Sequence, residues 1–346
     1  MKTIAAVLVE PGHPLEIGEI EIPPLQRGQV LVEVSYSGIC HTQLLETRGF
    51  RGEDRFLPHC LGHEGSGVVV ETGPGVSRVR RDDKAILSWI KANGADVPGT
   101  KYRWGSTTVN AGAITTFSHH AVISENRITP ISDSLPMDQM ALVGCAVPTG
   151  AGAVFNTAGA RPGQSIAIFG VGGIGMCAVA AAAVAQCSRI IAVDLRPTQL
   201  EICRRLGATD LVNAGACDAV SEIKRIAPGG VDIAIEATGR PQVMAQALGC
   251  VRNQGGTAVV IGNAHHGESI TLDPHEFNLG KRLLGTWGGD NQPDRDFPRY
   301  VKLVGEKRIP VENMMSRSYR LEEINQALDN LEAGREARPL IAFASN

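Results

Sequence analysis

The chain has 346 residues, more than one hydrophobic core usually organises, so we expect two domains. Its formal net charge of −3 gives no electrostatic footprint for a nucleic acid or an anionic membrane, which excludes both as expected partners. The eight cysteines include no short-spaced pair and no signal-peptide pattern follows Met1, so we expect reduced thiols in a cytoplasmic protein.

Short alternating strands, separated by turns, characterise the chain from residue 5 to about residue 126. Clear strand patterns cover 30–34 and 67–71, and Pro-Gly or Gly-Pro-Gly turns lie between such runs. This pattern predicts a β-rich, partly open barrel-like domain. The polar stretch 91–100 is predicted to be a loop, either simply solvated or acting as a lid or subunit contact.

Strand and helix patterns alternate from about residue 149 to residue 285. The expected strands cover 166–169, 190–194, 231–235 and 257–261, and a helix follows each of the first three. This alternation predicts a parallel sheet with helices on both faces. The tail returns to an amphipathic helix over 321–332 and a strand over 339–343, which we expect to rejoin the first domain.

A glycine-rich turn follows the first of these strands and opens a helix of small residues. Its glycines are Gly170, Gly172, Gly173 and Gly175. The first glycine permits a tight turn, the second lets the backbone approach a pyrophosphate, and the last lets helix and strand pack closely. The free N–H groups of the helix N-terminus then face the phosphate charge. This sequence therefore predicts a dinucleotide-binding domain.

An acid ends the next strand: Asp194 lies nineteen positions past the last glycine. A carboxylate there binds the adenosine ribose hydroxyls and repels a 2′-phosphate, so we expect NAD rather than NADP. Arg196 provides the opposite interpretation, because an arginine at this place sometimes holds the 2′-phosphate.

Three separate segments contain residue types that can bind metals: Gly-Ile-Cys-His-Thr around Cys40, Gly-His-Glu-Gly around His63, and Val-Gly-Cys at Cys145. Their separations match no short zinc-finger spacing, so spacing alone favours buried thiols and a hydrogen-bonded histidine. Together with the glycine turn and the Glu-Ala-Thr-Gly segment at 236–239, however, these sequences resemble the zinc-dependent medium-chain alcohol dehydrogenases over essentially the whole length.

The resemblance implies an α/β fold with a GroES-like catalytic domain over 1–148, completed by 287–346, and a Rossmann coenzyme domain over 149–286. It also implies that Cys40, His63 and Cys145 bind one catalytic zinc, with Glu64 just behind as an occasional or outer ligand. Two thiolates and an imidazole leave one tetrahedral position open for an alcohol. The metal promotes loss of the hydroxyl proton, and a hydride then passes to NAD.

The same resemblance assigns further roles. Thr42 matches the hydroxyl that takes the substrate proton, and Trp89 matches an aromatic residue of the alcohol pocket, although core packing is the alternative for Trp89. His41, Thr149 and Arg338 match residues that contact the cofactor. Family members commonly pair through the edge of the coenzyme domain, which implies a homodimer or homotetramer.

The chain departs from the family pattern in three places. Leu45 stands where many members have a proton-exit histidine. Gln43 replaces the aspartate that orients the zinc-bound imidazole, and we expect its amide oxygen to accept a hydrogen bond from His63. No cysteine occurs between Cys60 and Cys145, so we expect no structural zinc.

The predicted function is the interconversion of an alcohol and an aldehyde or ketone. The segments 285–289 and 293–296 look closest to the bacterial aryl-alcohol and glutathione-dependent formaldehyde branch, while polyols and cyclitols remain alternative substrates. A zinc-free quinone or enone reductase, or a non-catalytic nucleotide sensor, would share the fold. The three candidate zinc ligands discriminate against the reductase, and Thr42 with these ligands discriminates against the sensor.

Overall fold

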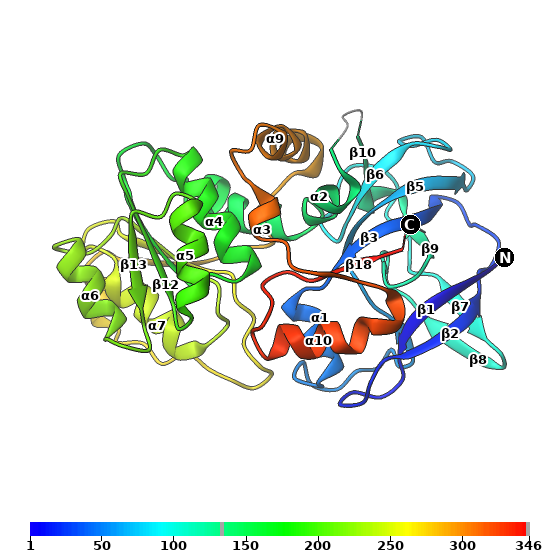
Figure 1. Cartoon of the computed structure of the whole chain (residues 1–346), viewed down its shortest axis with the longest axis horizontal. Helices are drawn as coiled ribbons and strands as arrows, with labels where there is room; N and C mark the ends of the chain where they lie inside the picture. Colours follow the sequence, from blue (N-terminus) through cyan, green and yellow to red (C-terminus); the bar gives the residue numbers. More distant parts are fainter. Residues whose placement is uncertain (132–134, 344–346) are drawn as a thin grey trace. The chain divides into compact units, whose positions relative to one another are not determined.

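The computed structural model describes residues 1–131 and 135–343, and the chain divides into two compact units (Figure 1). The first unit contains Met1–Cys145, Gln292–Lys302 and the chain from Met315 onward; the second contains Ala146–Asn291 and Leu303–Met314. The segment Leu303–Met314 was expected in the first domain. It lies in the second unit, where its apolar side chains are buried and the sulfur of Met314 lies 3.5 Å from the sulfur of Cys177.

The first unit contains a closed barrel and a seven-stranded sheet. The barrel follows the order β1 (Lys2–Leu8), β2 (Glu16–Glu21), β7 (Lys101–Trp104), β8 (Thr107–Asn110) and β4 (His59–Cys60). The sheet follows the order β10 (Ile128–Pro130), β6 (Lys84–Ser88), β5 (Glu64–Thr72), β3 (Gln29–Gly38), β18 (Leu340–Ala342) and β17 (Ser318–Tyr319), with β9 (His120–Ser124) also paired to β3. Strand β18 runs antiparallel to β3, with Leu340 opposite Gly38.

The helices of this unit are α1 (His41–Thr47), α2 (Met137–Leu142), α10 (Ile324–Glu332) and the first part of α9 (Pro293–Gly305). Single 3-10 turns lie at Glu125–Arg127 and Leu321–Glu323. Apolar side chains of β3, β5 and β6 pack with those of α10 in the main core, because alternate strand residues point inward.

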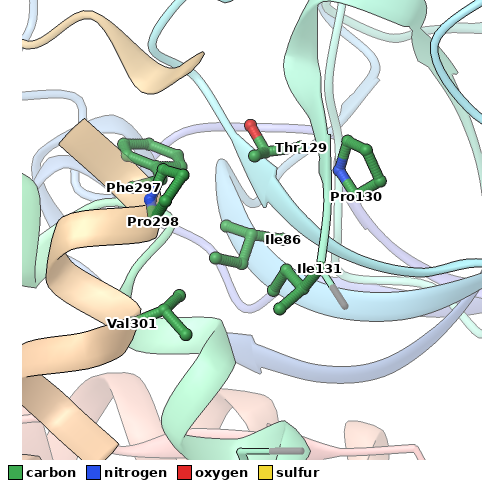
Figure 2. A pocket seen from close by; sticks show the side chains of 7 residues that line it. All are labelled: Ile86, Thr129, Pro130, Ile131, Phe297, Pro298 and Val301. Carbon is green, nitrogen blue, oxygen red and sulfur yellow. The ribbon is translucent and has the colours of Figure 1, made fainter. Parts of the chain in front are cut away.

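A small recess lies where α9 meets β6 and β10 (Figure 2). Figure 2 shows its lining, in which Phe297, Pro298 and Val301 of α9 face Ile86, Thr129, Pro130 and Ile131. Its volume is about 60 Å³, room for about two water molecules. The recess is therefore a gap in apolar packing and is too small for a substrate.

The second unit contains a six-stranded parallel sheet. Its strands, in spatial order, are β13 (Asp210–Asn213), β12 (Arg189–Asp194), β11 (Ser165–Phe169), β14 (Ile233–Glu236), β15 (Thr257–Val260) and β16 (Arg282–Gly285). Its helices are α3 (Ala146–Gly152), α4 (Gly173–Val184), α5 (Pro197–Arg205), α6 (Ala219–Ile226), α7 (Pro241–Cys250) and α8 (His275–Asn278), with a π-helical turn at Ala153–Thr157 and a 3-10 turn at Val311–Asn313. The α/β class predicted from the sequence is confirmed. Strands β13 and β16 were not predicted.

None of the helices within 1–131 and 135–343 combines the length and the apolar character needed to cross a membrane. The apolar run at 166–185 divides into β11, the glycine turn and α4. The glycines therefore form the turn between a strand and a helix, as their spacing predicts.

Candidate metal centre and nucleotide-binding turn

Three side chains with metal-binding atoms meet in the first unit. Cys40 precedes α1, His63 precedes β5, and Cys145 follows α2. One ligand atom from each lies within 4.8 Å of the others, and both cysteines are buried. Two sulfurs and an imidazole nitrogen are a donor set that suits zinc. The fold thus joins the three residues whose sequence spacing alone gave no metal motif.

The glycines next to two of the ligands are required by the backbone conformation at Gly62 and by close packing at Gly144. Gly62 has φ +92°, a left-handed conformation that favours glycine, and it lies next to His63, just before β5. A Cβ on Gly144 would overlap the carbonyl oxygen of Leu87, so only glycine lets the chain carrying Cys145 approach β6. The local sequences Gly-His and Gly-Cys therefore have a steric cause.

The imidazole of His63 has one nitrogen engaged and one free for a ligand. Its Nδ1 lies in a short contact with the amide nitrogen of Gln43. Its Nε2 is buried and has no hydrogen-bond partner among the described residues. A buried polar atom without a partner is costly, and coordination of a metal removes that cost. The residues present therefore fit a zinc ion.

The orientation of Gln43 differs from the expectation. Its amide oxygen accepts a hydrogen bond of 3.0 Å from the backbone N–H of Cys40, so the amide nitrogen, not the oxygen, faces His63. The backbone N–H at the start of α1 has no partner within the helix and takes the oxygen. One side chain thereby contacts two of the three candidate ligands.

Charges around the cluster favour a thiolate at Cys40. A hydrogen bond from the Cys145 thiol, with the positive charges of Arg338 and His63, lowers the pKa of Cys40 well below its ordinary value. Burial opposes a charge on His63, but the adjacent Cys40 sulfur and the negative charges of Cys40 and Glu64 raise the pKa of the imidazole. A proton on His63 therefore competes with an incoming cation for the imidazole.

Behind the ligands lies a buried ion pair between Glu64 and Arg338. The carboxylate of Glu64 points to the guanidinium and lies outside the group of converging ligand atoms. A Cβ on Gly38 would overlap this carboxylate, so Gly38 provides the space for it. The predicted contact of Arg338 with the cofactor remains a prediction, and its Nε is buried without a partner in the described chain.

Two further predicted residues lie beside the cluster. The hydroxyl of Thr42 is 3.9 Å from the sulfur of Cys40. The indole N–H of Trp89 donates to the sulfur of Cys145 at 3.3 Å, and its ring meets His63 edge-on with centroids 6.3 Å apart. Trp89 thus contacts two candidate ligands, and it also packs against the main hydrophobic core, as the alternative interpretation predicted.

The glycine turn of the second unit has the geometry that its sequence predicts. Gly170 ends β11 with φ +80°, and Gly172 precedes the first turn of α4. A Cβ on Gly175 would overlap the carbonyl oxygen of Gly170, whereas one on Gly172 would meet nothing within 4 Å. Gly175 therefore serves helix packing, and Gly172 leaves a face open to a ligand.

The acid after β12 is tied to this turn. Asp194 accepts hydrogen bonds from the backbone N–H of Val171 at 2.9 Å and from Arg196, whose backbone N–H and Nε lie 3.0 and 3.1 Å away. Arg196 therefore forms an ion pair with the carboxylate in this structure. Thr149 is buried in α3, and His41 is exposed at the start of α1; their predicted contacts with the cofactor remain predictions.

Comparisons with known proteins show the family. Residues 26–133 match the alcohol dehydrogenase GroES-like domain, and residues 173–306 match the zinc-binding dehydrogenase family. The S-(hydroxymethyl)glutathione dehydrogenase of a Synechocystis strain is 34% identical, over 99% of this chain and all of that protein. The chain belongs to the zinc-binding alcohol dehydrogenases. This membership confirms the predicted family, the predicted pair of domain types and the prediction of an oxidoreductase.

Solved structures of such dehydrogenases have the same fold. The benzyl alcohol dehydrogenase of Acinetobacter calcoaceticus is 30% identical with a TM-score of 0.90, over 99% of this chain and 100% of that one. An alcohol dehydrogenase zinc-binding domain protein from Burkholderia ambifaria is 32% identical with a TM-score of 0.93, over 100% of both chains. The whole chain therefore has the architecture of a zinc-binding alcohol dehydrogenase.

Proposed function

We propose that the protein is an NAD-dependent alcohol dehydrogenase with one catalytic zinc held by Cys40, His63 and Cys145. The observation that carries the proposal is the convergence of three ligand atoms within 4.8 Å around a partnerless, buried Nε2. When bound, zinc supplies a Lewis acid that lowers the pKa of an alcohol hydroxyl, and NAD supplies the hydride acceptor.

The side chains around the ligands position the substrate and accept its proton. In this proposal the Thr42 hydroxyl takes the proton of the reacting hydroxyl, and its distance of 3.9 Å from the sulfur of Cys40 supports this role. Leu45 is buried and has no group that carries a proton, so the next acceptor is water or a cofactor hydroxyl. The indole N–H of Trp89 lowers the charge density on Cys145, and Gln43 holds both Cys40 and His63 in place.

The proposed cofactor is NAD. The carboxylate of Asp194 lies at the glycine turn, where it favours ribose hydroxyls and repels a 2′-phosphate. The ion pair of Arg196 with Asp194 supports this preference, because it directs the guanidinium to the acid. A higher kcat/KM with NADP than with NAD would show that the acid has another role.

We propose one zinc per chain, a homodimer or homotetramer, and a cytoplasmic location. The stretch 91–100 is held by hydrogen bonds, including Ala95 N–H to Glu125 at 2.8 Å and Val97 N–H to Ser124 at 3.0 Å, which supports a lobe formed without metal. Strand β16 ends the sheet with Leu284 exposed, which favours pairing with a second copy. The eight free cysteines suit a reducing compartment.

The test combines elemental analysis with activity. We expect about one zinc per chain and NADH formation with at least one alcohol of a panel of aromatic, aliphatic and polyhydroxylated compounds. Cys40→Ala removes a ligand and is expected to lose zinc and activity together, whereas Cys203→Ala, at a buried thiol of the second unit outside the cluster, serves as the control. A Cys40→Ala protein with stoichiometric zinc and full activity would overturn the assignment.

A further inference from the structure

A chamber of about 460 Å³ adjoins the candidate metal centre within the first unit. Its wall begins at His63 and Gln43 and continues along α1 to Glu46. The opposite side is formed by the chain around β4 and by the end of β8. This volume is in the range of sites for small molecules, whereas the recess of Figure 2 is not.

Small residues keep the chamber open. Gly99, Ala111 and Gly112 line it with little or no side chain, so the space next to His63 is not filled by the protein itself. A substrate that reacts at the metal centre has its reacting carbon close to this imidazole. The remainder of the molecule then has the chamber as adjacent space within the same unit.

Two of the charged groups in the chamber satisfy each other. Asp54 accepts a hydrogen bond from Nε2 of His59 at 2.8 Å and another from the backbone N–H of Phe56 at 2.9 Å. Nδ1 of the same imidazole lies 3.0 Å from the carbonyl oxygen of Cys60. Asp54 and His59 therefore already have partners within the chain, so neither side chain depends on a substrate for its hydrogen bonds.

Glu46 differs from this pair. Its side chain is half-buried and has no hydrogen-bond or ion-pair partner within the described part of the chain. Arg51 on the neighbouring loop is exposed and makes no ion pair with it. A carboxylate in this setting gains free energy from any donor that enters the chamber, because burial has removed part of its water.

The position of Glu46 on α1 fixes where that donor would lie. Glu46 follows Thr42 by four residues, so the two side chains lie on the same side of the helix about 6 Å apart along its axis. A substrate whose reacting hydroxyl lies at Thr42 therefore reaches Glu46 with a group several bonds away.

We propose that the chamber binds the distal end of the substrate and that Glu46 selects alcohols carrying a second hydrogen-bond donor, a hydroxyl or an ammonium. This inference rests on the proposed alcohol dehydrogenase function. It deepens that function by naming a substrate class: a diol or an amino alcohol is preferred over the corresponding plain alcohol.

The experiment compares kcat/KM of the zinc-loaded enzyme for three matched substrates: benzyl alcohol, 4-(hydroxymethyl)benzyl alcohol and 4-(aminomethyl)benzyl alcohol. The wild type is expected to prefer the two donor-bearing compounds. Glu46→Gln keeps the shape but removes the charge, and it should lower the preference for the amine about 10- to 100-fold and that for the diol by less. Glu53→Gln, on an exposed side chain outside the chamber, is the matched control and should leave both preferences unchanged.

The binding step is measured separately, from the inhibition constant of 4-methylbenzylamine, which has the distal ammonium but no reacting hydroxyl. Glu46→Gln should raise this constant by a similar factor. If the wild type oxidises benzyl alcohol but Glu46→Gln lowers kcat/KM equally for all three substrates, the selective role is wrong and the alcohol dehydrogenase function stands. If the wild type with full zinc oxidises no alcohol, the proposed function fails, and this inference fails with it.

Discussion

Replacing Trp89 with phenylalanine removes the indole N–H that donates to a candidate zinc ligand. The indole N–H donates to the sulfur of Cys145 at 3.3 Å, while the ring meets His63 edge-on. A phenyl ring retains the aromatic contact and loses the donor. The substitution therefore isolates the contribution of the N–H to the affinity of the site for zinc.

The expected loss follows from the charge on the acceptor. A hydrogen bond to a charged group contributes about 1.5–3 kcal/mol, and sulfur is a weaker acceptor than oxygen, so the lower end applies. Loss of an outer partner of a metal ligand typically weakens metal binding about 10- to 100-fold. We therefore expect the zinc dissociation constant of Trp89→Phe to rise about 10-fold, or about 1.4 kcal/mol.

The assay is competition for zinc between the protein and a chromogenic chelator of known affinity. Trp287→Phe is the matched control, because Trp287 is 75% exposed and lies outside the metal centre. Thermal unfolding of the metal-free proteins checks that both variants fold. Zinc dissociation constants that are equal for Trp89→Phe and the wild type would refute the role assigned to the N–H, as would an equal loss in Trp287→Phe.

Three other predictions follow from the same structure. Gly38→Ala places a Cβ against the carboxylate of Glu64 and should lower the free energy of unfolding, measured by urea titration, by about 1–3 kcal/mol. Gly249→Ala is the control, because a Cβ there meets nothing within 4 Å, and it should not lower the free energy of unfolding. Asp194→Asn removes the charge that repels a 2′-phosphate and should raise the NADP-to-NAD ratio of kcat/KM about tenfold; an unchanged ratio argues against its role. Because the pKa of His63 is raised in the metal-free protein, a proton on its imidazole competes with zinc once the pH falls below that pKa. The affinity for zinc should then drop by up to about tenfold per pH unit for each proton displaced. A zinc affinity that does not change with pH in chelator competition would contradict this prediction.

The nucleotide-binding turn was predictable because its signals are local. The apolar run before Gly170 and the small residues after it place β11 and α4 where the structure has them. Strands β13 and β16 escaped prediction because they lie at the two ends of the sheet, where little of a strand is buried. Only Val212 is buried in β13 and no residue is buried in β16, so neither strand has an apolar pattern to detect.

The metal centre was predictable only by resemblance. Cys40, His63 and Cys145 come from three different parts of the chain, and their meeting depends on the pairing of β3, β5 and β6. Individual atomic contacts could not be predicted from the sequence for the same reason. Which end of the Gln43 amide faces His63, and where the N–H of Trp89 ends, are decided by neighbours that sequence spacing does not reveal.

The ion pair between Glu64 and Arg338 joins residues 274 positions apart in the sequence. Just beyond Arg338, the Pro339 carbonyl accepts a hydrogen bond of 3.0 Å from the backbone N–H of Ile39, next to Cys40. During synthesis, the ligands emerge from the ribosome long before the cation that balances Glu64. A nascent or truncated chain that ends before residue 338 thus holds an uncompensated acid behind its metal site, so a nearly full-length chain is the shortest one that completes this centre.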